Sequence, residues 1–95
     1  MFIGNLVLSG NVMVIVENPE LPYVAIGYDN GILELISIYK PEKPTVMTSF
    51  NLTKNRIGNV KFFEKGHVIV VGSSDIGEFF LIEVNYFFNW TLEHE

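Results

Sequence analysis

The chain contains two copies of one pattern, spaced by 45 to 46 residues, and this repeat limits its fold more than any other feature. Residues 24–27 align with residues 69–72, and Gly31 aligns with Gly77. Further matches pair Val14 with Val60 and Val16 with Phe62. A period of this length is typical of folds that stack one supersecondary unit on the next. The sequence therefore predicts one domain of residues 1–95 with two units, at about residues 10–52 and about residues 53–90.

Each unit is predicted to consist of β-strands. Valine, isoleucine, phenylalanine and tyrosine occur in short runs bounded by glycine, proline, asparagine and aspartate, which is the pattern of strands rather than helices. Because these runs alternate with short turns, we expect antiparallel meanders. The predicted strands are residues 2–8, 12–16, 23–28, 32–39, 45–52, 57–63, 67–73 and 78–87, with a further strand near Trp90.

The turns support this prediction. Asp29, Asn30 and Gly31 tolerate the left-handed backbone of a tight hairpin, and residues 74–77 take the corresponding place in the second unit. Two prolines mark a loop at residues 39–45, because proline cannot donate a backbone hydrogen bond to a neighbouring strand. We therefore expect the aspartates of both turns to be turn-forming residues.

The repeat resembles the blades of WD-repeat β-propellers. Such a blade has four antiparallel strands and spans about 40 to 45 residues. Residues 62–66 resemble the turn between the first two strands of a blade, and residues 70–75 resemble the second strand with its aspartate-containing turn. The resemblance implies an all-β fold, in which two antiparallel four-stranded meanders form two WD40-like blades of an incomplete propeller.

The sequence departs from the WD-repeat pattern at its usual landmarks. The tryptophan position is filled by Ile36 and Ile82, and the aspartate that follows it is replaced by Ser37 and Glu83. The Gly-His pair that precedes the first strand of a typical blade is also missing. The buried hydrogen-bond network of the family therefore cannot form here as it does in typical members.

Within the WD-repeat group, the chain resembles the large cilia- and flagella-associated proteins and the axonemal dynein intermediate chains. Residues 21–31 and 39–44 carry this resemblance. It implies a cytoplasmic protein that takes part in a ciliary or flagellar axonemal assembly.

Two blades cannot complete a propeller, since these rings close with 4 to 8 blades. Each blade packs flat against its neighbours, so a pair leaves two apolar faces without a partner. The composition agrees, because 48% of the residues are hydrophobic and 18% are charged, whereas about 25% charged residues are usual. We therefore expect the chain to be completed by the remaining blades of a larger propeller or by other proteins.

The sequence argues against several other functions. The net charge is −5, and the six basic residues form no stripe that could follow a nucleic acid. The absence of cysteine excludes disulfides and thiolate zinc sites, and no apolar run reaches the roughly 18 residues that cross a bilayer. His67 and His94 have no arrangement that suits catalysis or metal binding. We expect no enzyme activity, no cofactor, no metal, and no nucleic-acid or membrane partner.

The predicted function is that of a scaffold for protein–protein interactions. Rigid blades present turns and edges to partners, and a few aromatic or charged anchors supply most of the affinity in such interfaces. An alternative is a small independent β-barrel that binds an apolar ligand in its interior, suggested by the many short strands and the apolar excess. The residues expected to contact a partner lie in turns or in the tail: Tyr28, Asp29, Asn30, Lys54, Arg56, Asp75, Phe87, Phe88 and Trp90.

Overall fold

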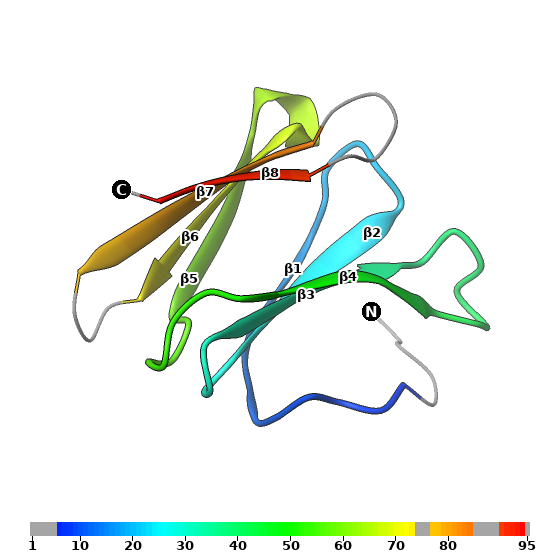
Figure 1. Cartoon of the computed structure of the whole chain (residues 1–95). Helices are drawn as coiled ribbons and strands as arrows, with labels where there is room; N and C mark the ends of the chain where they lie inside the picture. Colours follow the sequence, from blue (N-terminus) through cyan, green and yellow to red (C-terminus); the bar gives the residue numbers. More distant parts are fainter. Residues whose placement is uncertain (1–5, 74–76, 85–89, 95) are drawn as a thin grey trace.

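The computed structural model of the chain describes residues 6–73, 77–84 and 90–94. In this part of the chain, eight strands form two antiparallel sheets with the orders β1-β2-β3-β4 and β5-β6-β7-β8 (Figure 1). The predicted all-β fold, two four-stranded meanders that do not close into a ring, is confirmed. The strands are β1 Val12–Glu17, β2 Tyr23–Tyr28, β3 Ile32–Ser37, β4 Thr45–Asn51, β5 Asn59–Phe63, β6 Val68–Ser73, β7 Glu78–Val84 and β8 Trp90–His94.

The predicted strands match these elements with changes at their ends. The main error lies near the N-terminus, where residues 6–8 are not in a strand. Residues 2–5 and 85–87 of two predicted strands lie outside the described residues. The strand predicted at residues 57–63 begins at Asn59, and the further strand predicted near Trp90 is β8.

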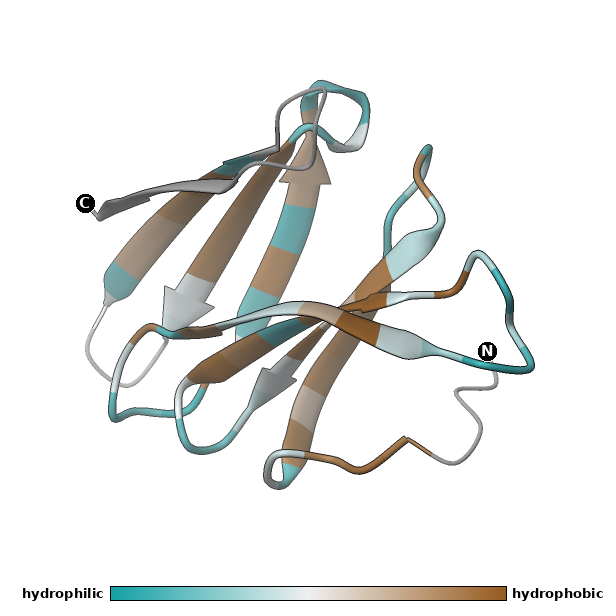
Figure 2. Cartoon of the chain, turned by 45° about the vertical axis from the view of Figure 1, so that its right-hand side comes forward, coloured by the Kyte–Doolittle hydropathy of each residue, from teal (hydrophilic) through white to brown (hydrophobic). Residues whose placement is uncertain are grey.

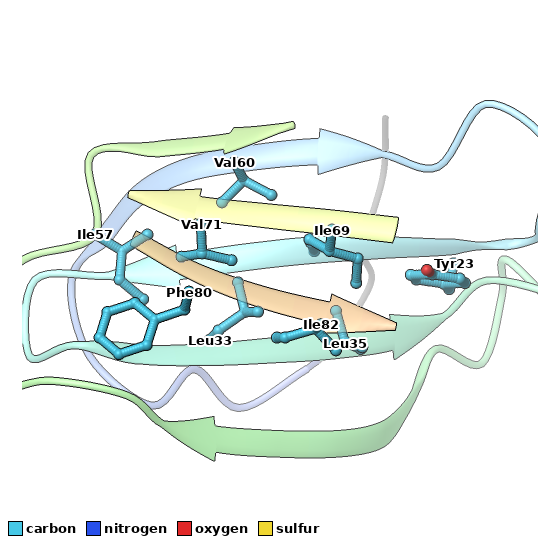
Figure 3. Close-up of a cluster of buried hydrophobic side chains, with 10 residues drawn as sticks. Tyr23, Leu33, Leu35, Ile57, Val60, Ile69, Val71, Phe80 and Ile82 are labelled. Carbon is cyan, nitrogen blue, oxygen red and sulfur yellow. The ribbon is translucent and has the colours of Figure 1, made fainter. Parts of the chain in front are cut away.

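The separate sheets also correct the alternative fold. A barrel is one sheet closed on itself, whereas the described strands form two sheets with no pairing between them. Ten buried side chains from the two sheets and the linker pack together in the space between the sheets (Figure 3). The prediction of a small closed barrel is therefore wrong for the described strands, whereas the binding of an apolar ligand stays a prediction.

The two sheets pack face to face around one hydrophobic core. Each fully buried valine, leucine, isoleucine or phenylalanine side chain contributes roughly 1.5 to 3 kcal/mol to the free energy of unfolding. The core between the two sheets is therefore a main source of their stability. Ile57, which lies in the linker between the sheets, joins the core at the same end as Phe80, and Tyr23 lies at the opposite end (Figure 3). The core consists of Tyr23, Ala25, Leu33 and Leu35 from the first sheet, Ile57 from the linker, and Val60, Ile69, Val71, Phe80 and Ile82 from the second sheet.

The two units use opposite faces for this contact. Leu33 and Leu35 face the core, but their counterparts 46 residues later, Phe79 and Leu81, lie on the other face of the second sheet. The converse holds for the neighbouring positions of the same strands, because Ile36 packs on the far side of the first sheet while Ile82 faces the core. A repeated head-to-tail step produces this arrangement, and successive propeller blades are related in that way.

The pairing of β1 corrects one part of the sequence alignment. Ile15 pairs with Ile26, and Val60 pairs with Val71. Because Ile26 and Val71 correspond at an offset of 45, Ile15 and not Val14 is the counterpart of Val60. Both first-strand matches of the sequence alignment are therefore wrong by one residue. An alternating strand looks the same after such a shift, although each side chain moves to the opposite face.

The outer face of the first sheet is covered by the N-terminal segment, residues 6–11. Leu6 packs against a second cluster of buried residues. The Ser9 Oγ donates a 2.6 Å hydrogen bond to the Glu34 carboxylate, and the Asn30 side-chain amide donates to the Ser9 carbonyl at 2.9 Å. We call this surface the sealed face, and its buried apolar residues are Val24, Ile26, Tyr28 and Ile36. The prediction that both end faces lack a partner is therefore wrong at this end.

Candidate interaction surface

The outer face of the second sheet is the exposed counterpart of the core-facing surface of the first sheet. Phe79 is 54% exposed and Phe63 is 49% exposed. Figure 2 shows apolar colouring along β6 and β7 as well as along β2 and β3. We call this surface the open face, and it consists of Phe63, Val68, Val70, Phe79 and Leu81, which share one side of the sheet through their cross-strand pairing.

Charged residues border the open face. Lys61 pairs with Val70, and Glu83 pairs with Val68, so both charged side chains lie on the same side of the sheet as the apolar residues. Both are exposed. An apolar centre with a polar rim is the usual anatomy of a protein–protein interface.

A hollow of about 170 Å³ lies at one end of the open face. Gly72 lines it, and the Phe79 ring lies beside this glycine. Gly77 adopts a φ of +68°, a backbone conformation that glycine accepts without strain. The described residues that line the hollow are Asn59, Gly72, Ser73, Gly77, Glu78 and Phe79.

The structure brings four of the predicted contact residues to one end of the molecule. Asp29 and Asn30 are exposed in the turn between β2 and β3, and Lys54 and Arg56 are exposed in the linker. The turn and the linker touch, because a Cβ placed on Gly31 would collide with the Thr53 carbonyl. These four exposed polar residues therefore lie on two segments that touch, and we call them the polar surface of the turn and the linker.

Asp29 is a turn residue, as predicted, and it also holds the N-terminal segment. Its carboxylate accepts hydrogen bonds from the Asn11 backbone at 3.3 Å and from the Asn11 side-chain amide at 2.9 Å. Its neighbour Asn30 accepts a bond from the Ile32 backbone at 3.2 Å and donates to Ser9. The turn thus fastens the segment that seals the first sheet.

The prediction that Tyr28 is exposed for contact is wrong. Tyr28 is completely buried on the sealed face, where its hydroxyl donates a 2.5 Å hydrogen bond to the Glu34 carboxylate. Burial raises the pKa of Tyr28 from 10.0 to about 12, and the hydrogen bond with Glu34 adds to the rise. Tyr28 precedes a turn, which suggested exposure, but the N-terminal segment covers it.

The other predicted contact residues fall in parts of the chain about which less is described. Asp75, Phe87 and Phe88 lie outside the described residues. Trp90 is the first residue of β8 and pairs with Val84, and its side chain is outside the description. Their role as contact residues stays a prediction.

The described residues hold no group of three or more histidine, cysteine, aspartate or glutamate side chains that could bind a metal ion. His67 is an exposed residue of the turn between β5 and β6. A second hollow of about 210 Å³ lies beside Pro22, Tyr23, Ser37, Tyr39 and Met47, and its lining is almost entirely apolar. In the described ranges, no helix has the length and apolar character needed to span a membrane.

The sequence predicted an apolar face without a partner, but it did not name the residues of the open face as contacts, although the repeat contains the signal for them. Prediction favoured turn and tail residues as contacts, because turns of rigid scaffolds carry function in many proteins. Phe79 and Phe80 are consecutive in a strand and must therefore lie on opposite faces. With only two units, one of these two aromatic side chains has no second sheet to cover it.

Comparison with models of protein families, with curated proteins and with solved structures finds no match to this chain. The resemblance to WD-repeat proteins and to axonemal proteins thus stays a prediction from the residues.

Proposed function

We propose that the chain is a non-catalytic scaffold that binds other proteins, or the remaining blades of a larger propeller, through the open face. The observation that carries this proposal is an apolar surface with two half-exposed phenylalanines, bordered by charges. Soluble proteins seldom expose a contiguous apolar face of this kind unless it serves an interaction. The head-to-tail packing supports the same conclusion, because the corresponding face of the first sheet is covered by a second sheet.

The proposed setting is the cytoplasm, in a ciliary or flagellar axonemal assembly, and it rests on the WD-repeat resemblance alone. A fluorescent fusion of the chain expressed in ciliated cells tests it. Accumulation along the axoneme is expected, and a uniform cytosolic signal would contradict the setting without touching the proposed scaffold function.

The scaffold function is tested by affinity capture with quantitative mass spectrometry. The chain is compared with Phe63→Lys, which places a charge on the open face, and with Val46→Lys, a matched control at a 42% exposed valine of the first sheet. A protein that the chain and the control retain, but Phe63→Lys loses, is the expected result. Equal retention by all three forms, or no specific protein, would count against an interface on the open face.

The polar surface formed by the turn and the linker is tested in the same experiment. The double variants Asp29→Ala/Asn30→Ala and Lys54→Ala/Arg56→Ala truncate its exposed side chains. If only these double variants lose the captured protein, the interface lies at the turn and the linker and not on the open face.

A further inference from the structure

The hollow on the open face corresponds to the place where the linker docks on the first unit. Gly27 pairs with Val14 and with Leu33 in the first sheet, and Gly72 pairs with Asn59 and with Phe79 in the second. Gly72 is therefore the structural counterpart of Gly27. The six residues that line the hollow correspond, at offsets of 45 and 46, to Val14, Gly27, Tyr28, Gly31, Ile32 and Leu33.

On the first unit, this place is filled by the chain's own linker. The Ile57 side chain lies over Gly27 so closely that a Cβ placed on Gly27 would come within 2.6 Å of the Ile57 Cγ2. The linker backbone is also held, because the Ile57 N–H donates to the Tyr28 carbonyl and the Leu52 N–H donates to the Gly31 carbonyl, both at 3.1 Å. One aliphatic side chain and two backbone hydrogen bonds thus define the contact.

On the second unit, the same groups surround an open space. A Cβ placed on Gly72 would lie 3.6 Å from its nearest neighbour, and a Cβ placed on Gly77 would meet nothing within 4 Å among the described residues. The Ser73 carbonyl accepts a bond from the Gly77 N–H at 3.0 Å, just as the Tyr28 carbonyl accepts one from Gly31 at 3.3 Å. A carbonyl oxygen can accept two hydrogen bonds. On the first unit, the second bond to the Tyr28 carbonyl comes from the Ile57 N–H, and the Ser73 carbonyl is the corresponding acceptor on the second unit.

The Ser73 side chain is not part of this site. Ser73 lies two residues after the core residue Val71, so its side chain is on the side of the sheet that faces the first unit, opposite to Gly72 and Phe79. The Ser73 backbone carbonyl is therefore the group that a segment bound in the hollow would contact.

We propose that the hollow binds an extended segment of a partner protein with the chemistry of residues 55–57 of this chain. A branched aliphatic side chain enters over Gly72, the adjacent backbone N–H donates to the Ser73 carbonyl, and the strand that follows lies against the open face. This inference rests on the proposed scaffold function and adds the chemistry of the partner. A second copy of the chain is the poorer occupant, because its own Ile57 is 1% exposed and would have to leave its core.

The test uses a synthetic peptide with the sequence of residues 51–63 as the probe, titrated into the full ¹⁵N-labelled chain. The expected result is saturable shifts of the backbone amide signals of Gly72, Ser73, Gly77 and Phe79. A peptide carrying Ile57→Asp is expected to bind the unaltered chain about tenfold more weakly or worse, since an apolar anchor loses its pocket. This second peptide keeps the test valid if a chain variant fails to fold.

In the chain, Gly72→Val places a branched side chain in the hollow and is expected to weaken peptide binding by about tenfold or more, whereas Val46→Lys, at an exposed valine of the first sheet, leaves the hollow intact and retains binding. Shifts around Gly27 instead of Gly72, equal binding of both peptides, or no saturable shift would overturn the inference. Shifts of the Gly72 and Gly77 amides on concentrating the chain alone would assign the hollow to a second copy and would also overturn it. If Phe63→Lys abolishes capture of a partner and Gly72→Val does not, the scaffold function is supported and this inference is overturned.

Discussion

Replacing each of the two corresponding glycines by alanine tests how differently the two units are covered. Gly27 and Gly72 occupy the same place in β2 and β6, and neither has a positive φ. A Cβ on Gly27 would lie 2.6 Å from the Ile57 Cγ2 and 2.8 Å from the Val14 Cγ1, whereas a Cβ on Gly72 would make ordinary contact at 3.6 Å. The two substitutions therefore have opposite expected signs.

Overpacking of a well-packed core costs about 1 to 3 kcal/mol, so Gly27→Ala should destabilise the chain by up to about 3 kcal/mol. At roughly 4 to 8 °C per kcal/mol for a domain of this size, the melting temperature should fall by up to about 24 °C. Gly72→Ala meets no clash and restricts the unfolded chain, which stabilises by about 0.4 to 1 kcal/mol. Gly27→Ala restricts the unfolded chain to the same extent, so this effect cancels, and the expected difference between the two variants is about 1 to 3 kcal/mol, the overpacking cost alone.

Urea unfolding monitored by circular dichroism measures this difference, with an unchanged m value as the sign that only stability has changed. Equal effects of the two substitutions, or a larger loss for Gly72→Ala, would refute the conclusion that the linker fills the first site and leaves the second open.

Three other predictions concern the sealed and open faces. Tyr28→Phe removes one of the two hydroxyl donors to the buried Glu34 carboxylate and should lower the free energy of unfolding in urea by about 1 to 3 kcal/mol. The control Tyr39→Phe, at a 76% exposed site, should change stability by less than about 0.5 kcal/mol. Equal losses for the two variants would contradict the burial of Tyr28. Burial raises the pKa of Tyr23 and Tyr28 to about 12 in the folded chain. The stability that these tyrosines contribute should therefore be complete below pH 10 and decline between pH 10 and 12, where only the unfolded chain releases these protons. The double variant Tyr23→Phe/Tyr28→Phe should show a shallower decline, and an unchanged slope would contradict the raised pKa values. Phe79→Lys should reduce the fluorescence of a bound apolar dye, and undiminished fluorescence would show that the dye binds elsewhere than the open face.

The repeat and the turns could be predicted from the sequence because they depend on local chemistry. Gly31 and Gly77 adopt φ angles of +82° and +68°, which few residues other than glycine accept. The strands follow from runs of β-branched and aromatic residues between such turns. These features gave the number of units and the antiparallel order without any knowledge of distant contacts.

The faces could not be predicted, because they depend on contacts between distant parts of the chain. Val14 and Ile15 are both aliphatic, so the sequence does not show which of them faces the core. The burial of Tyr28 likewise depends on Leu6 and Ser9, which approach from an N-terminal segment whose described residues form no strand. Only the strand pairing and the packing of that segment decide which end of the molecule is sealed and which is open.

Two head-to-tail units leave one sealed face and one open face. Hydroxyl-radical footprinting of the purified chain, resolved by residue with mass spectrometry, measures this directly. We predict rapid labelling of Phe63 and Phe79 together with protection of Tyr23, Tyr28 and Leu33, and Tyr39 provides an exposed tyrosine as the internal reference. Labelling of Tyr28 as fast as Tyr39, or protection of Phe79 equal to that of its counterpart Leu33, would contradict the claim.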